Sequence, residues 1–285
     1  MLEIHEIAQP VKEELLEIYQ AFTDVCQKHG LRHWVAYGTM LGAVRHHGFI
    51  PWDDDFDVFM LREEYERFLA IADEALPPWF KPITYRNCKA YPATFAKIQE
   101  TRRYIYNRVR ETCGYVNPHG LYIDIFPLDG CPVGWFAKKL DVLRLGTLFC
   151  MDSHLFRAGG HSTLKGRVAD LLGTLLTVFH PSLRTKNDFA RQADRIYTHT
   201  PTNPPPSLRR GDYEAHFQRS ELVMPRAAFD DTLTVPFEGS HVPIPKDYDA
   251  CLKAMYGSGY MTPPPLEKRV SEHSRMETVP WIYGP

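Results

Sequence analysis

Several common features are missing from this 285-residue sequence, and each absence excludes a class of protein. Charge of one sign is not in excess: 33 Lys and Arg residues face 35 Asp and Glu residues, whereas dedicated nucleic-acid binders usually carry a strong positive excess. The six cysteines form no CxxC pair, which excludes a zinc ribbon and a thioredoxin motif. No apolar run is long enough to span a bilayer, and the first twenty residues lack the apolar core of a secretion signal. We therefore expect a protein with reduced thiols and no nucleic-acid partner.

Apolar residues are plentiful: 44% of the chain is hydrophobic and 13% is aromatic, enough for a large core. Apolar periodicity predicts helices over 10–28, 39–45 and 62–76, and strands over 33–37 and 55–60. Short β-prone runs follow over 80–86, 93–98, 101–106 and 121–126. Their close succession favours antiparallel neighbours over repeated parallel units.

The second half of the chain changes character. Residues 132–198 read as helical and carry ten basic residues against five acidic ones. Such a stretch can rest on an anionic membrane surface, although a packed helical subdomain with solvated charges is the favoured alternative. A Pro-rich loop over 200–206 comes next, then a hairpin over 232–244 and a helix over 247–255.

Three alternate aspartates, Asp53, Asp55 and Asp57, stand just before an apolar run. Side chains two residues apart share one face of a strand, so three carboxylates there would repel one another. A divalent cation would compensate, and oxygen ligands select Mg²⁺, Mn²⁺ or Ca²⁺ over zinc. The alternative is a solvated turn after Pro51. The direct continuation into Val58 favours a site at the end of a buried strand.

Other candidate residues lie on neighbouring elements. Gly38 and Thr39, at a strand-to-helix junction, can offer backbone N–H groups to an anion, the alternative being a simple helix cap by Thr39. Asp124 lies inside an apolar run, so it is either salt-bridged or a metal ligand, and we favour the ligand. Lys97 is either a phosphate-neutralising charge or an exposed strand lysine. We expect Asp129 to be a turn residue. A phosphate cradle beside a metal site is what phosphoryl transfer needs.

The run YGTMLGAVRHHGFIPWDDDFDVFM resembles the signature of the LicD-type phosphocholine transferase family, which is related to fukutin-type phosphoribitol transferases. The runs LYIDIFPLD at 121–129 and FAKI at 95–98 resemble it too, as does a C-terminal series from Phe237 to His273. Residues 131–230 carry no motif of that family. The chain also departs from the family at Ser258 and Gly259, where Gly-Asp-Tyr-Met is common.

The resemblance implies an α+β fold, a nucleotidyltransferase-like mixed β-sheet core flanked by helices with a mostly helical insertion. The catalytic core would span 1–130. Residues 131–200 would form the helical insertion, facing membrane or acceptor. Residues 201–285 would supply a Pro-rich linker and a C-terminal hairpin and helix that complete the substrate pocket.

The resemblance also assigns roles. Metal ligands would be Asp55, Asp57 and Asp124, with Asp53 as an additional ligand or as the base for the acceptor, a role that Asp124 could also fill. Substrate-binding residues would be Gly38, Thr39, Arg45, Lys97, Arg269 and His273, the last two on the C-terminal resemblance alone.

The implied reaction uses Mg²⁺ or Mn²⁺. It transfers phosphocholine, or a related phospho-alcohol, from a CDP-activated donor such as CDP-choline, and it releases CMP. The acceptor is a hydroxyl of a cell-surface glycan or teichoic acid precursor, including a lipid-linked oligosaccharide. Two alternatives stay open: a nucleotidyltransferase that moves NMP from an NTP to a small acceptor, and a catalytically inactive glycan-binding protein. We expect a cytoplasmic location and leave open a peripheral contact with the inner face of the membrane.

Overall fold

The computed structural model describes residues 9–88, 91, 93–104, 120–156, 171, 174–175, 182–202, 207–210, 222–269 and 282–283. Within them the helices are α1 (Gln9–His29), α2 (Tyr37–His46), α3 (Arg62–Ala75), α5 (Trp135–Phe156), α7 (Lys186–Tyr197) and α9 (Tyr248–Tyr256), with short 3-10 helices η1 (Arg226–Phe229) and η2 (Leu266–Lys268). The strands there are β1 (Trp34–Val35), β2 (Asp57–Leu61), β3 (Phe80–Ile83), β4 (Ala96–Glu100), β5 (Arg103–Tyr104), β6 (Tyr122–Gly130), β7 (Ser207–Arg210), β8 (Val223–Pro225), β9 (Thr232–Phe237), β10 (Ser240–Pro245) and β11 (Ile282–Tyr283).

Local patterns predicted most of these elements well. The apolar stripe of α1 is buried as its spacing of three and four residues requires, and the helix ends at His29, directly before Gly30, which has a positive φ of 61°. Helices α3 and α9 begin and end within one residue of the predicted bounds. The predicted hairpin is formed by β9 and β10, and its turn uses Glu238 and Gly239 at φ 46° and 76°.

Seven of the described strands form one mixed sheet, with the order β1-β2-β6-β4-β3 and with β7 and β8 continuing from the far half of β6. Strands β3, β4 and β6 are antiparallel neighbours, as predicted, while β2 and β6 run parallel. Strand β5 pairs with β11 and not with its neighbours in sequence, so the prediction for that strand is wrong. The predicted α+β class is confirmed.

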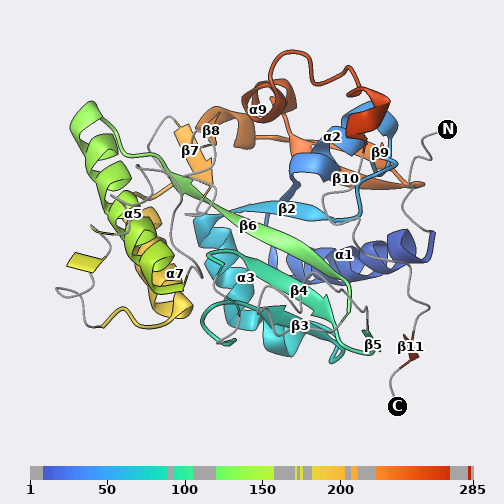
Figure 1. Ribbon diagram of the computed structural model, residues 1–285. Coiled ribbons are helices and arrows are strands. Elements are labelled where there is room, and N and C mark those ends of the chain that lie inside the picture. The colour runs from blue at the N-terminus through green and yellow to red at the C-terminus, as the bar shows by residue number, and fades with distance from the viewer. Residues whose placement is uncertain are drawn as a thin grey trace.

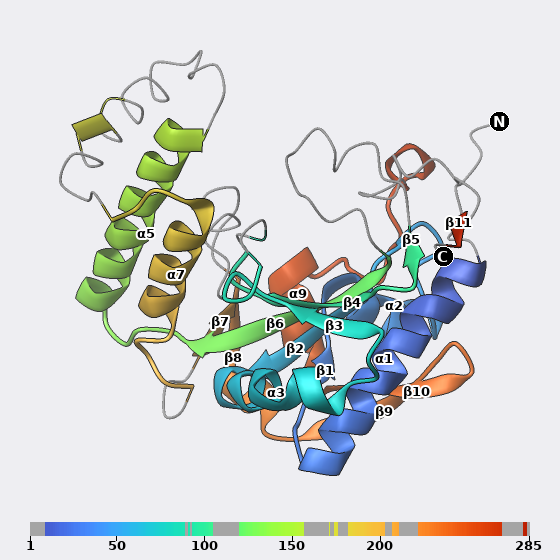
Figure 2. The ribbon, with the colours of Figure 1, turned by 90° about the horizontal axis from the view of Figure 1, so that it is seen from below.

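Aromatic side chains join the helices to this sheet. Helices α1 and α3 lie side by side, and the rings of Phe22 and Phe68 are 5.0 Å apart (Figure 2). Phe56, which precedes β2, is fully buried with its ring 4.4 Å from that of Tyr19 on α1. Helices α2 and α9 and the β9–β10 hairpin gather near β1 and β2, above the sheet in Figure 1. The core therefore fixes the loop before β2 from both sides.

Helices α5 and α7 lie between β6 and β7 in the sequence. They pack against each other to one side of the sheet in both ribbon views (Figures 1 and 2). They have an apolar cluster of their own, which includes Leu145, Leu148 and Phe189. Among the described residues no helix combines the length and the apolar character needed to cross a membrane.

The prediction for Asp129 is wrong. Strand β6 continues past Pro127, and Asp129 lies inside it, fully buried. Its two oxygens accept hydrogen bonds from Arg62 Nε and Nη2 at 2.7 and 2.8 Å. This bidentate pair supplies the compensation that a buried carboxylate needs.

Candidate active site

Three candidate residues lie in one row across the sheet. Asp57 at the start of β2 is the register partner of Asp124 on β6, which is in turn the partner of Lys97 on β4. Directly paired residues on neighbouring strands share a face, so these side chains project to the same side. Lys97 Nζ forms an ion pair with Asp124 Oδ1 and lies 3.5 Å from the centre of the Tyr122 ring. In this structure Asp124 is thus salt-bridged, and its role as a ligand stays a prediction.

The acidic run reaches this row through a turn, not through a longer strand. Strand β2 begins at Asp57, two residues later than predicted, and the Asp53 N–H donates to the Ile50 carbonyl at 2.9 Å. Phe56 is fully buried, and Asp53, Asp54 and Asp55 before it are all partly exposed.

The amino end of α2 is locked to the same acids. The Asp57 N–H donates to Thr39 Oγ1 at 2.9 Å, and the Ala36 N–H donates to the Asp57 carbonyl at 2.9 Å. A Cβ atom at position 38 would overlap the carboxylate of Asp53, so only glycine permits this close approach. The alternative role of Thr39 as the helix cap is wrong, because the helix begins at Tyr37 and the cap residue is Ala36.

Tyr256, the last residue of α9, is influenced by the charges of the acidic run. Desolvation raises the pKa of its hydroxyl well above the ordinary value, and the negative charges of Asp57, Asp53 and Asp55 raise it further. The residue as a whole is 45% exposed, so Tyr256 lies at the surface of the site. Sequence reasoning missed this residue, although it belongs to the Tyr-Gly pair of the C-terminal series.

Positive charges gather beside the acids. Burial lowers the pKa of Arg45, which Arg269 also lowers, while Tyr256 acts in the opposite direction. The pKa of His46 is likewise lowered by burial and by the charges of Arg45 and Arg269. The Arg269 guanidinium lies over the ring of Trp52 at 5.2 Å. Like charges held this close to one another form a suitable site for an anion.

Arg45 and Arg269 are each fixed by a backbone carbonyl. Arg45 Nη1 donates to the Tyr260 carbonyl at 2.8 Å, and Arg269 Nε donates to the Pro264 carbonyl at 2.8 Å. Both acceptors lie in the segment after α9, where the chain departs from the family pattern. That segment therefore orients the cationic group beside the acids.

The hairpin tip holds the loop that leads into the acidic run. Glu238 Oε1 accepts from the Phe49 N–H at 3.0 Å, and the Glu238 N–H donates to the His47 carbonyl at 3.0 Å. Lys12 on α1 lies 3.4 Å from the same oxygen, and a Cβ atom at Gly48 would overlap the Glu238 carboxylate. Position 238 thus ties α1, the loop and the hairpin together.

The structure brings nearly all the predicted site residues into two adjoining groups. One group, which we call the acidic group, holds Asp53, Asp55, Asp57 and Asp124, with Gly38, Thr39 and Lys97 beside them; the other, the cationic group, holds Arg45 and Arg269. Tyr256 is the neighbour that both groups share. His273 lies outside the described residues. Within the described part of the chain, no three His, Cys, Asp or Glu side chains are arranged so that they could hold a metal ion.

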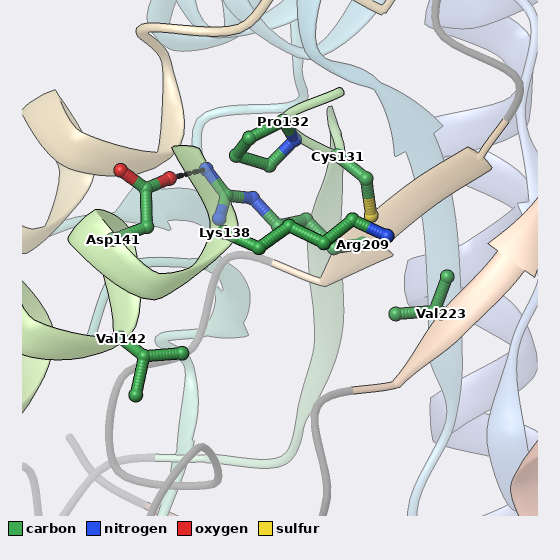
Figure 3. Close-up of a pocket in the computed structure, with 7 residues that line it drawn as sticks. All are labelled: Cys131, Pro132, Lys138, Asp141, Val142, Arg209 and Val223. Carbon is green, nitrogen blue, oxygen red and sulfur yellow. Dashed lines mark ion pairs between the residues drawn. The ribbon is translucent and has the colours of Figure 1, made fainter. Parts of the chain in front are cut away.

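A small cavity of about 30 Å³ lies elsewhere, at the other end of β6 (Figure 3). It is lined by Cys131, Pro132, Lys138, Asp141, Val142, Arg209 and Val223. Residues 124 and 130 are six positions apart, roughly 20 Å along a strand, so this cavity is not part of the acidic group.

Comparison with known proteins agrees with this geometry. The family described as "LicD/FKTN/FKRP, nucleotidyltransferase domain" matches residues 30–130. The chain is 29% identical over 267 residues to a protein of Haemophilus influenzae described as lipopolysaccharide cholinephosphotransferase LicD; the match covers 90% of this chain and 92% of that protein. An uncharacterized protein of Rickettsia typhi is 37% identical over 78 residues, which are 26% of this chain and 24% of that protein. The family match contains both the Gly38–Thr39 junction and the acids of β2 and β6, so residues 30–130 of this chain are similar to the nucleotidyltransferase domain of the LicD/FKTN/FKRP family.

Proposed function

We propose that this protein transfers phosphocholine from CDP-choline to a hydroxyl of lipopolysaccharide or of a related glycan precursor and releases CMP. The observation that carries the proposal is the pairing of Asp57 with Asp124 across β2 and β6, with Thr39 and Gly38 at the amino end of α2 closed against Asp57 and Asp53. Acids that can hold a cation and guanidinium groups that can hold phosphates are the parts that phosphoryl transfer needs. The Haemophilus influenzae relative, matched over most of both chains, supports the choice of phosphocholine and of the acceptor.

The carboxylate oxygens of the acidic group are of the chemical type that a hard divalent cation, Mg²⁺ or Mn²⁺, prefers, although no three of them in the described chain are arranged around a common metal position. Asp55 and Asp57 would hold the ion. Asp124, the register partner of Asp57, would join them in competition with Lys97, its present partner. When bound, the ion would neutralise negative charge on the diphosphate and on the leaving CMP.

The protein's own residues have distinct tasks in the reaction. The acceptor oxygen forms a bond to the phosphorus of phosphocholine as the bond from that phosphorus to the CMP oxygen breaks, and CMP leaves with those electrons. Asp53 or Asp124 would accept the hydroxyl proton, and Asp124 would have to leave Lys97 to do so. Arg45 and Arg269 would bind phosphate oxygens.

Trp52 is the candidate contact for the quaternary ammonium group. It already holds one cation, the Arg269 guanidinium, over its ring. The other aromatic neighbours suit this role less well. Trp34 is fully buried, and the Tyr37 ring packs edge-on against Phe59 and Phe126.

The setting of the reaction is also a proposal. The described cysteines Cys26, Cys88, Cys131 and Cys251 are free thiols, which is in keeping with a cytoplasmic location. A teichoic acid precursor or a lipid-linked oligosaccharide would offer the same acceptor chemistry, a sugar or polyol hydroxyl. Peripheral contact with the inner face of the membrane would bring the enzyme to an acceptor of that kind.

The test is a product assay on the full chain. Purified protein is incubated with Mg²⁺ and a panel of CDP-alcohols, with and without lipopolysaccharide lacking choline, and CMP is measured. We expect acceptor-dependent CMP release that is fastest with CDP-choline and is abolished by EDTA. Pyrophosphate release from an NTP in place of CMP would show a nucleotidyltransferase, and no product with any donor would favour an inactive glycan-binding protein.

A further inference from the structure

Helix α5 has two apolar faces, and one of them has no cover in the described structure. The inner face packs against α7 and carries the buried residues Asp141, Leu145, Leu148 and Met151, spaced by three and four. The side away from it carries Trp135, Phe136 and Leu143, which are 73, 74 and 66% exposed. We call these three residues, with Val133 and Val142, the outer patch. In both ribbon views α5 lies at the outer edge of the molecule (Figures 1 and 2).

A buried ion pair fixes which way α5 faces. Asp141 Oδ2 on the inner face lies 2.9 Å from Arg209 Nη2 on β7, the contact drawn as a dashed line in Figure 3. The Arg209 side chain is almost fully buried, and its guanidinium lies 5.0 Å from the centre of the Tyr197 ring on α7. Separating such a pair would leave a buried charge without compensation. The helix therefore does not roll to bury the outer patch, which stays turned away from the core.

The charges around the outer patch have one sign. Lys138, Lys139 and Arg144 are all exposed on these turns of α5, and the acidic residue of the stretch, Asp141, is buried beside Arg209. Lys138 and Arg144 are on the sides nearer Asp141: Lys138 lines the cavity of Figure 3, and Arg144 Nη1 lies 3.9 Å from Asp141 Oδ1. A helix that displays Trp, Phe and Leu among Lys and Arg side chains has the composition of a segment that lies in a lipid interface. The lysine stems can extend so that their ammonium groups reach lipid phosphates.

We propose that the outer patch docks α5 on the surface of an anionic lipid membrane. The patch lies just after the end of β6 that is remote from Asp124, roughly 20 Å along the strand. Docking there keeps the acidic group away from the lipid surface. That distance suits an acceptor whose hydroxyl is on the glycan part of a lipid-linked molecule, an argument that rests on the proposed function. The docking itself does not depend on the proposed function.

The experiment is vesicle flotation with the full-length protein. Vesicles are made of phosphatidylcholine alone or with about thirty per cent phosphatidylglycerol. The test variant is Trp135→Gln with Phe136→Gln. Leu233→Gln, an exposed apolar residue of the hairpin, is the matched control, and Lys139→Glu probes charge. Circular dichroism and CMP release from a soluble donor are measured on every variant.

We expect the wild type and Leu233→Gln to float with anionic vesicles. The double variant should bind these vesicles with an affinity at least about tenfold lower. Lys139→Glu should also weaken binding, and added salt should weaken it further. Equal binding by the double variant and the wild type would overturn the proposal. So would a wild-type dimer that the double variant converts to monomer without loss of vesicle binding. Since flotation needs no turnover, it stays decisive if CMP release fails.

Discussion

The phenol of Tyr256 interacts electrostatically with both the acidic group and the cationic group. Three aspartates raise its pKa beyond the effect of desolvation, so the hydroxyl stays protonated at working pH and can donate a hydrogen bond. Burial lowers the pKa of Arg45, and Tyr256 in turn acts to raise it. A neutral donor between carboxylates and guanidinium groups is well placed to bind a phosphate oxygen.

Replacing Tyr256 by Phe removes that donor while the ring keeps its packing. We expect kcat/KM for the CDP-alcohol to fall by about ten- to a hundredfold, the loss of one hydrogen bond to a charged group. Steady-state CMP release measures the effect, with Tyr248→Phe on the same helix as the control. An unchanged kcat/KM in Tyr256→Phe would remove the phenol from the site.

His33 gives a pH dependence to stability that has nothing to do with catalysis. Burial lowers its pKa to about 4, and its Nε2 lies 3.1 Å from the Tyr19 hydroxyl. As pH falls from about 6.5 to 4, the unfolded chain binds a proton at His33 that the folded chain refuses, so stability decreases by roughly 3 kcal/mol.

The check is urea unfolding at several pH values in this window. His33→Gln should lose that part of the decrease, whereas His241→Gln, at an exposed position, controls for the loss of a histidine. The same slope in His33→Gln and the wild type would contradict the assignment.

Among the elements, the tip of the β9–β10 hairpin stabilises the loop before the acidic run, although the two are far apart in the sequence. The Glu238 carboxylate accepts a hydrogen bond from the Phe49 N–H and so holds the loop that precedes Trp52 and Asp53. Because Glu238→Ala leaves that N–H without its acceptor, we expect a loss of about 1–3 kcal/mol in stability together with slower turnover. Glu238→Gln keeps an oxygen for the N–H and should keep most activity. Thermal unfolding and CMP release measure both; wild-type behaviour of Glu238→Ala would show that the loop is held by other contacts.

Sequence patterns predicted the elements whose causes are local. The stripe of α1 and the turn at Glu238 and Gly239 follow from residues within a few positions of one another. Asp129 was mispredicted because its partner, Arg62, is 67 residues away and only the sheet brings the two together. The link between Lys97 and Asp124 likewise depends on register across two strands. The run of carboxylates directly before an apolar strand is a local pattern, which is why the sequence alone singles it out as a candidate site.

At the scale of the whole molecule, polar side chains attach the α5–α7 pair to the core. Asp194 on α7 lies 3.1 Å from Arg62 Nη1 and accepts the Tyr85 hydroxyl at 2.8 Å. Asn187, in the first turn of α7, donates a hydrogen bond to the Tyr85 carbonyl at 2.6 Å. The position of the outer patch relative to the active site therefore depends on a few buried contacts as well as on the Arg209–Asp141 pair.

Asp194→Asn removes one charge from that attachment and leaves Arg62 only partly compensated. We expect faster amide hydrogen exchange in α7 and α5, with little change in β2 and β6, because the local opening of the pair becomes easier. Arg195→Gln, on the exposed side of the same helix, is the matched control. Equal acceleration throughout the sheet would show that the pair and the core open as one unit.

The central claim is that a small set of carboxylates before and within β2 carries the transfer reaction, and CMP release by three single variants tests it most directly. Asp55→Asn and Asp57→Asn should each abolish acceptor-dependent CMP release from CDP-choline. Asp54→Asn should keep most of it, because residue 54 alternates along the chain with residues 53, 55 and 57. Comparable loss in all three variants, or full activity in Asp55→Asn and Asp57→Asn, would contradict the account.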